Sequence, residues 1–261
     1  MISTTGDFKA QRSTINDKGN FSKIAVSDQK PSCVVFGTCL ENICLVDIEA
    51  KSLIGLNHDK ETTEQTAISE IKFLDENTVL CCGAKSGNLS LVDLRERGHK
   101  DCPRNKTKVI NKADSKTSSY WTMDITSDFV FRLSASGNIV ISDVRNGTDS
   151  ILNEVNSQLH CKTDQFDIRI QASPIHKDTV SLSGFDGNIY IYDTQRTPTE
   201  TAGSIYTEPI FTHEGHVRNC GDQSESVKTL CHMWHPWKPD LIMSSATDSS
   251  LHAWEYHLHN S

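Results

Sequence analysis

Two cysteines and two histidines near the C-terminus carry the side chains that most often bind zinc in proteins. Cys220, Cys231, His232 and His235 lie within a short span, and thiolate and imidazole are both zinc ligands. On a strand, however, neighbouring side chains point to opposite faces, so Cys231 and His232 would point apart. The span also lacks a C-x-x-C pair to hold an ion. We therefore expect no metal and no other cofactor.

Short catalytic motifs are missing from the sequence. It contains no G-x-S-x-G nucleophile elbow, no G-x-x-x-x-G-K-S/T phosphate loop and no H-E-x-x-H metalloprotease pair. Each of these patterns places a nucleophile, a phosphate cradle or a metal at a fixed position in a fold. We therefore expect neither an enzyme nor a small-molecule substrate.

Composition favours a soluble intracellular protein with a packed core. The 261 residues are 36% hydrophobic and carry a net charge of −8, which argues against a nucleic-acid-binding surface over the whole domain. Residues 1–20 lack the apolar core of a signal peptide, and no run is long enough to span a membrane. The nine cysteines, an odd number without paired short spacings, indicate reduced thiols.

A basic segment at 95–116 interrupts this acidic chain. One interpretation is a docking site for an acidic partner or RNA; the other is a solvated loop. No aromatic residues alternate with the basic ones to stack on bases, which favours the loop. The basic residues are Arg95, Arg97, Lys100, Arg104, Lys106, Lys108, Lys112 and Lys116.

An aromatic and proline-rich segment provides a second candidate partner surface. Trp234, His235 and Trp237 are accompanied by Pro236 and Pro239 and are expected between strands. Such a segment forms either a rigid turn packed on the sheet or an aromatic contact for a protein partner. Both interpretations remain open at this point.

The elements that would position these residues are five copies of one strand–turn–strand unit. The copies lie at 33–47, 78–93, 129–143, 179–193 and 241–255, and each ends in an acidic residue. Successive acidic residues are separated by 46 to 62 residues, a spacing that suits a four-stranded blade with loop insertions. Outer strands are expected at 51–56, 107–110, 150–152 and 208–211. Helical patterning is almost absent, so the sequence predicts an all-β fold.

The last copy resembles a WD repeat. Gly215 and His216 precede it, and Trp254 and Glu255 close it. In the WD-repeat family a histidine, a serine or threonine, a turn aspartate and a tryptophan form a hydrogen-bonded structural network. The resemblance implies that His216, Ser244, Asp248 and Trp254 form that network here. The corresponding tryptophan position is Val46, Val92, Ser142 and Tyr192 in the other copies, so those copies are expected to depend on apolar burial and sheet hydrogen bonds.

Longer stretches resemble the C-terminal half of the WD repeat-containing protein 73 family. They are 182–187, 208–216, 234–236 and 245–254, in the family's order and spacing, and the likeness extends upstream at 45–47, 73–75, 81–83 and 87–93. The resemblance implies a WD-repeat β-propeller or partial propeller of about five four-stranded antiparallel blades. Its repeats would occupy about 22–57, 67–111, 118–155, 166–212 and 227–257 of a domain at 21–261. The family's N-terminal region, roughly two blades, has no counterpart, so an open or strained arc is expected. Within the N-terminal segment 1–20, residues 8–15 could supply the closing outer strand.

The same resemblance implies a non-catalytic cytoplasmic scaffold. Members of the family are linked to assembly of the RNA-endonuclease module of the Integrator complex, where they hold its two metallo-β-lactamase-like subunits. They are also linked to the cytoskeleton, spindle poles and microtubule organisation. Integrator subunits are thus the first expected partners, and tubulin or spindle components, or an acidic or RNA partner of the basic segment, are the alternatives.

Overall fold

The computed structural model describes residues 23–50, 52–55, 66–95, 108–111, 120–143, 151–161, 167–201, 204–218 and 227–257. Strands dominate this part of the chain. Its helical residues are a 3-10 turn, η1 (Leu40–Asn42), and a single-turn helix, α1 (Gly215–Arg218). No helix among the described residues is long and apolar enough to cross a membrane.

Five antiparallel sheets are formed in chain order. Among the described residues, the first four have four strands each and the fifth has three. The first sheet has the order β1 (Lys23–Val26), β2 (Cys33–Gly37), β3 (Cys44–Asp47), β4 (Ser52–Gly55); the second β5 (Ile68–Phe73), β6 (Thr78–Gly83), β7 (Leu89–Asp93), β8 (Lys108–Asn111); the third β9 (Trp121–Ile125), β10 (Phe129–Ser134), β11 (Asn138–Asp143), β12 (Ile151–Asn156); the fourth β13 (Arg169–Ala172), β14 (Thr179–Ser183), β15 (Ile189–Asp193), β18 (Phe211–His213); the fifth β19 (Thr229–Trp234), β20 (Leu241–Ala246), β21 (Leu251–Glu255). A small hairpin, β16 (Thr199–Thr201) and β17 (Ser204–Tyr206), lies between β15 and β18.

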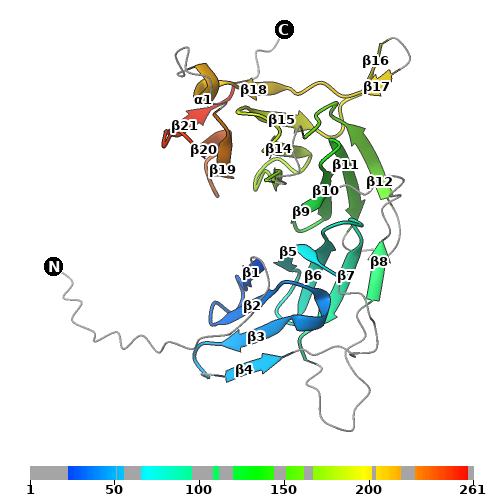
Figure 1. Ribbon diagram of the computed structural model, residues 1–261, viewed down its shortest axis with the longest axis vertical. Coiled ribbons are helices and arrows are strands. Elements are labelled where there is room, and N and C mark those ends of the chain that lie inside the picture. The colour runs from blue at the N-terminus through cyan, green and yellow to red at the C-terminus, as the bar shows by residue number, and fades with distance from the viewer. Residues whose placement is uncertain are drawn as a thin grey trace, which may run out of the picture.

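The sheets follow one another around an open arc (Figure 1), with the first sheet at one end and the fifth at the other. Each sheet is a meander in which neighbours in sequence pair, the usual construction of a propeller blade. The predicted all-β fold of repeated antiparallel sheets is confirmed, and the arc is that of a partial WD propeller.

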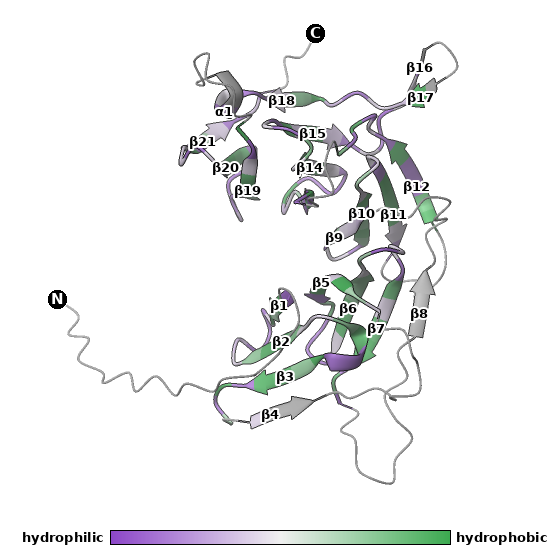
Figure 2. Ribbon diagram, in the orientation of Figure 1, coloured by the Kyte–Doolittle hydropathy of each residue, from purple (hydrophilic) through white to green (hydrophobic). Residues whose placement is uncertain are grey.

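Apolar residues of adjacent sheets pack face to face. Phe131, Leu133 and Ile141 of the third sheet pack with Val180 and Leu182 of the fourth in one buried cluster. Further clusters join the first sheet to the second, the second to the third and the fourth to the fifth. Figure 2 shows the hydrophobic residues concentrated in middle strands such as β6 and β7. Because each cluster joins only neighbouring sheets, the fold depends on contacts between successive blades.

Tight turns set the register of the hairpins. Between β10 and β11, Gly137 has φ +83°, and a Cβ at this position would collide with the backbone oxygen of Leu159. Only glycine adopts this conformation without strain. The turn thereby fixes the pairing of Leu133 with Ile139.

Two sequence expectations need correction. The outer strand of the fourth sheet is β18 at Phe211–His213 rather than 208–211, because Pro209 has no N–H to donate to a ladder. The blades without a tryptophan network also use buried polar contacts: Arg132, fully buried, donates to the Gly87 carbonyl oxygen at 2.8 Å and so joins the third sheet to the turn of the second. The expected closing strand at 8–15 lies outside the described residues.

Candidate functional site in the last sheet

A chain of hydrogen bonds brings together all four residues of the expected WD network. The Trp254 indole N–H donates to Ser244 Oγ at 3.2 Å, and Ser244 Oγ lies 2.8 Å from His216 Nε2. On the other side of the ring, His216 Nδ1 lies 2.6 Å from Ser250 Oγ, which donates to Asp248 Oδ1 at 2.6 Å. The network therefore connects Asp248 to His216 through Ser250, a link that the sequence interpretation missed.

The donors and acceptors assign one tautomer to His216. The Ser250 hydroxyl donates its only proton to Asp248, so its oxygen accepts a hydrogen bond from His216 Nδ1–H. Ser244 Oγ accepts from Trp254 and donates its own proton to His216 Nε2. His216 is thus neutral, and burial followed by nearby His252 lowers its pKa. Hydrogen bonds from Ser250 lower the pKa of Asp248, which keeps the Asp248 carboxylate at the end of this hydrogen-bond network charged.

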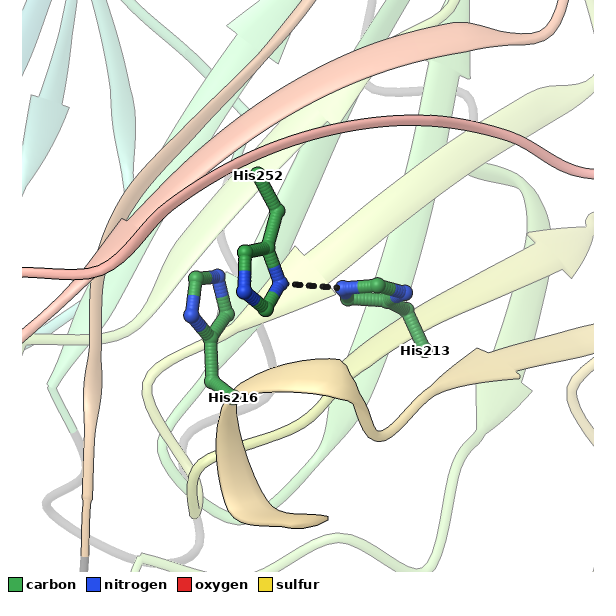
Figure 3. Close-up of side chains that lie close together, drawn as sticks. All are labelled: His213, His216 and His252. Atoms are coloured by element: carbon green, nitrogen blue, oxygen red, sulfur yellow. Dashed lines mark hydrogen bonds between the residues drawn. The ribbon is translucent and has the colours of Figure 1, made fainter. Parts of the chain in front are cut away.

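Two more histidines surround this network (Figure 3). His213 at the end of β18 and His252 on β21 lie with Nε2 and Nδ1 3.3 Å apart. The His252 ring is stacked on His216 at 4.0 Å between centroids, and the His213 ring on Trp254 at 4.1 Å. Burial, followed by His216 and His252, lowers the pKa of His213 to about 4. All three rings could hold a metal ion through one nitrogen each, since these nitrogens lie within 4.8 Å of one another.

The opposite face of the last sheet exposes several large apolar side chains. Met233 pairs with Met243 across β19 and β20, and Ser245 pairs with Leu251 across β20 and β21. Met233 is 57% exposed and Leu251 67% exposed. Alternation places these residues on the face away from His232, Ile242 and Ser244, which are buried. Exposed apolar side chains gathered on one face of a folded domain are typical of a protein interaction site.

The aromatic segment divides between core and surface. Trp234 is the last residue of β19 and not part of the inter-strand turn; it is buried, and its indole N–H donates to the Gln171 carbonyl oxygen at 3.3 Å. His235 Nδ1 accepts the backbone N–H of Lys238 at 3.0 Å and so shapes the turn. Trp237 is 79% exposed beside it. Trp237 is therefore the residue of this segment that can contact a partner directly.

Of the basic segment, the structure describes only residue 95 and residues 108–111. Arg95 is exposed and pairs with Asp93 at 2.6 Å. Lys108 begins β8. The remaining candidates, Arg97 and Lys106 among them, lie outside the described residues.

The cysteine and histidine quartet near the C-terminus is divided by the sheet. Cys231 is exposed, whereas His232 is buried between Ser181 and Ser183, with ring nitrogens 2.8 Å and 2.9 Å from their hydroxyls. Burial lowers the pKa of His232 to about 4. His232 therefore joins the fifth sheet to the fourth. Cys220 lies outside the described residues.

A hollow opens among the inner strands of the first three sheets. Ile24, Glu70, Lys72 and Asp124 are among the residues that line it. Lys72 Nζ and Asp124 Oδ1 form an ion pair at 2.9 Å. Burial is the main cause that raises the pKa of Glu70. The hollow is thus a charged surface, separate from the last sheet.

Known proteins resemble the chain over most of its length. No protein-family model matches it. It is 26% identical over 242 residues to the Integrator complex assembly factor WDR73 of Mus musculus, 27% over 246 residues to that of Danio rerio and 28% over 242 residues to that of Xenopus laevis. These matches cover 90%, 90% and 92% of this chain and 62%, 61% and 63% of the relatives. The chain thus spans less than two thirds of their length, and its resemblance to WD repeat-containing protein 73 is confirmed.

Proposed function

We propose that this chain is a non-catalytic WD-repeat scaffold that holds protein partners during assembly of the Integrator complex. The observation that carries the proposal is the similarity, over about nine tenths of the chain, to proteins named Integrator complex assembly factor. The partners we propose are the subunits of the RNA-endonuclease module, and the place of assembly is the cytoplasm. Both come from the family resemblance.

The structure supports a binding role in two ways. Its blades are held by buried side chains that fix the sheets, as His216, Ser244 and His232 do, and a rigid sheet presents a surface at little entropic cost. The exposed face at Met233, Met243 and Leu251 offers apolar area without needing any rearrangement. We therefore place the partner contact on this face, with Trp237 at its edge.

Affinity purification tests the proposal directly. The tagged chain, expressed in cells, should co-purify with the two Integrator metallo-β-lactamase-like subunits. The double variant Met233→Glu/Leu251→Glu should lose most of that recovery, because charge on an apolar contact face must be desolvated on binding. Ile205→Glu is the matched control, since Ile205 on β17 is 62% exposed and lies away from this face.

Two results would count against the proposal. Absence of both subunits from the wild-type eluate would remove the Integrator assignment. Equal recovery with the double variant and the control would remove the assigned face. The names of the relatives do not support the cytoskeletal or RNA-binding alternatives. Most of the basic segment also lies outside the described residues, so we propose neither alternative.

A further inference from the structure

The three histidines around the polar network come from three different elements. His213 ends β18, the outer strand of the fourth sheet, His216 lies in α1, and His252 lies on β21 of the fifth sheet. An ion held by them would connect two blades. Nothing in the polar network requires His213 or His252, because that network runs through His216 alone.

The distance between the two nearest nitrogens suits a shared ion. His213 Nε2 and His252 Nδ1 are 3.3 Å apart, slightly beyond the usual 2.7–3.2 Å of a hydrogen bond from nitrogen. Two imidazole nitrogens bound to tetrahedral zinc at about 2.0–2.1 Å would be about 3.3–3.4 Å apart. The pair thus already has the spacing of two zinc ligands.

Gly215 leaves room beside these nitrogens. A Cβ on Gly215 would lie 2.7 Å from His213 Nε2 and 2.9 Å from His252 Nδ1. The glycine therefore keeps open a space that both nitrogens border.

Ring stacking holds His213 and His252 in place. Trp254 lies parallel to His213 within 5°, and His216 lies parallel to His252 within 4°. His213 and His252 are perpendicular to each other, at 90°. Rings fixed in this way lose little freedom on binding an ion.

We propose that His213, His252 and His216 form a binding site for a divalent first-row metal ion, with Zn²⁺ as the best match. His213 Nε2 and His252 Nδ1 supply the first two ligands. His216 supplies the third by turning its ring toward the ion, which gives up its contacts with Ser244 and Ser250 and its stack on His252 for one coordinate bond, while Ser244 keeps its bond from Trp254. Imidazole suits zinc among the common divalent ions, and three protein ligands leave a fourth position open to water.

Metal binding to the purified chain tests the site. Every protein carries Cys231→Ser, because the exposed Cys231 thiol is a competing ligand. After treatment with a chelator, the chain is dialysed against Zn²⁺ and its metal content is measured; the absorption of bound Co²⁺ reports the geometry. We expect about one ion per chain, a tetrahedral Co²⁺ spectrum and a higher melting temperature with Zn²⁺.

Matched variants separate ligand loss from loss of fold. His213→Phe and His252→Phe keep an aromatic ring in each stack but remove the nitrogen, and each should lower zinc affinity at least tenfold. His235→Phe should bind zinc as the parent does. Ser244→Ala weakens the polar network but leaves all three ligands, so it should retain zinc even if it melts earlier. Zinc binding that is no stronger in the parent than in the double variant His213→Phe/His252→Phe would overturn the proposal, as would its loss in Ser244→Ala alone.

Discussion

Ser250 is the residue on which the polar network of the last sheet depends. Its hydroxyl accepts from buried His216 and donates to Asp248. Ser250→Ala should lower the free energy of unfolding by about 1–3 kcal/mol, because it leaves the Nδ1–H of a buried ring without an acceptor. Urea denaturation measures this loss. Ser245→Ala, on the exposed face of β20, is the control and should change stability by less than about 0.5 kcal/mol.

Trp254 contributes through its ring as well as its N–H. The ring stacks on His213 and lies near Phe211, whereas the N–H makes a single bond to Ser244. Trp254→Phe should cost about 1 kcal/mol, the usual net value of one hydrogen bond. Trp254→Ala should cost more, about 2–4 kcal/mol, because Trp254 is only partly buried and the largest core losses do not apply. Equal losses in the two variants, measured by chemical denaturation, would mean that the ring stacking contributes nothing.

Sequence alone predicts the four network residues because their identities and spacing form a family pattern. It does not predict Ser250, because a serine two residues after a turn aspartate is common in ordinary turns. Nor does it identify His213 and His252 as neighbours of His216. They approach one another only when β18 of the fourth sheet and β21 of the fifth meet, which no local spacing encodes.

At the scale of elements, the strands that the sequence predicts best are the middle ones. β6 is a largely hydrophobic run, β14 alternates hydroxyl and apolar residues, and turn residues come after each. Both strands are almost fully buried. The inner strands β1, β9 and β13 were not predicted, since their residues mix charged and apolar types. Inner strands border the middle of the arc, where charged side chains such as Lys72 and Asp124 pair with each other instead of packing on apolar neighbours. Hydrophobic patterning therefore does not reveal the inner strands, because part of their surface is charged instead of apolar.

The junction between the fourth and fifth sheets should weaken in acid. Burial, together with the nearby Arg169 charge, lowers the pKa of His232 from 6.5 to about 4. The unfolded chain therefore binds a proton at a higher pH than the folded chain does. The free energy of unfolding is therefore unaffected by this group above about pH 6.5. It falls as the pH falls toward 4, by about 3 kcal/mol in total.

Urea denaturation at several pH values isolates this effect when wild type is compared with His232→Asn, which does not titrate. Wild type should be the more stable protein at pH 7. The difference in free energy of unfolding should shrink between pH 6.5 and 4. A constant difference across that range would show that His232 does not take up its proton on unfolding.

In the whole molecule, each blade of the arc contacts only its neighbours. We therefore expect a substitution that destabilises one blade to have little effect on distant blades. Stability in such arrays is roughly a sum of blade terms and nearest-neighbour interface terms. In the part of the chain that the structure describes, the fifth sheet has three strands and one exposed face, whereas the second sheet is covered by the first and third. The fifth sheet should therefore open first. Hydrogen exchange should show lower protection of amides in β20 and β21 than in β6 and β10.

Two serine variants, one in the fifth sheet and one in the second, test whether destabilisation stays within one blade. Ser250→Ala removes a network bond in the fifth sheet, and Ser69→Ala removes the bond from Ser69 Oγ to the Cys82 carbonyl oxygen in the second. A local loss of about 1.4 kcal/mol raises the exchange rate about tenfold. Ser250→Ala should therefore speed exchange in β20 and β21 but leave β6 unchanged, and Ser69→Ala should do the reverse. Uniform acceleration of all five sheets by either variant would show one cooperative unit, because the loss would then lower the stability of the whole arc and not of one blade.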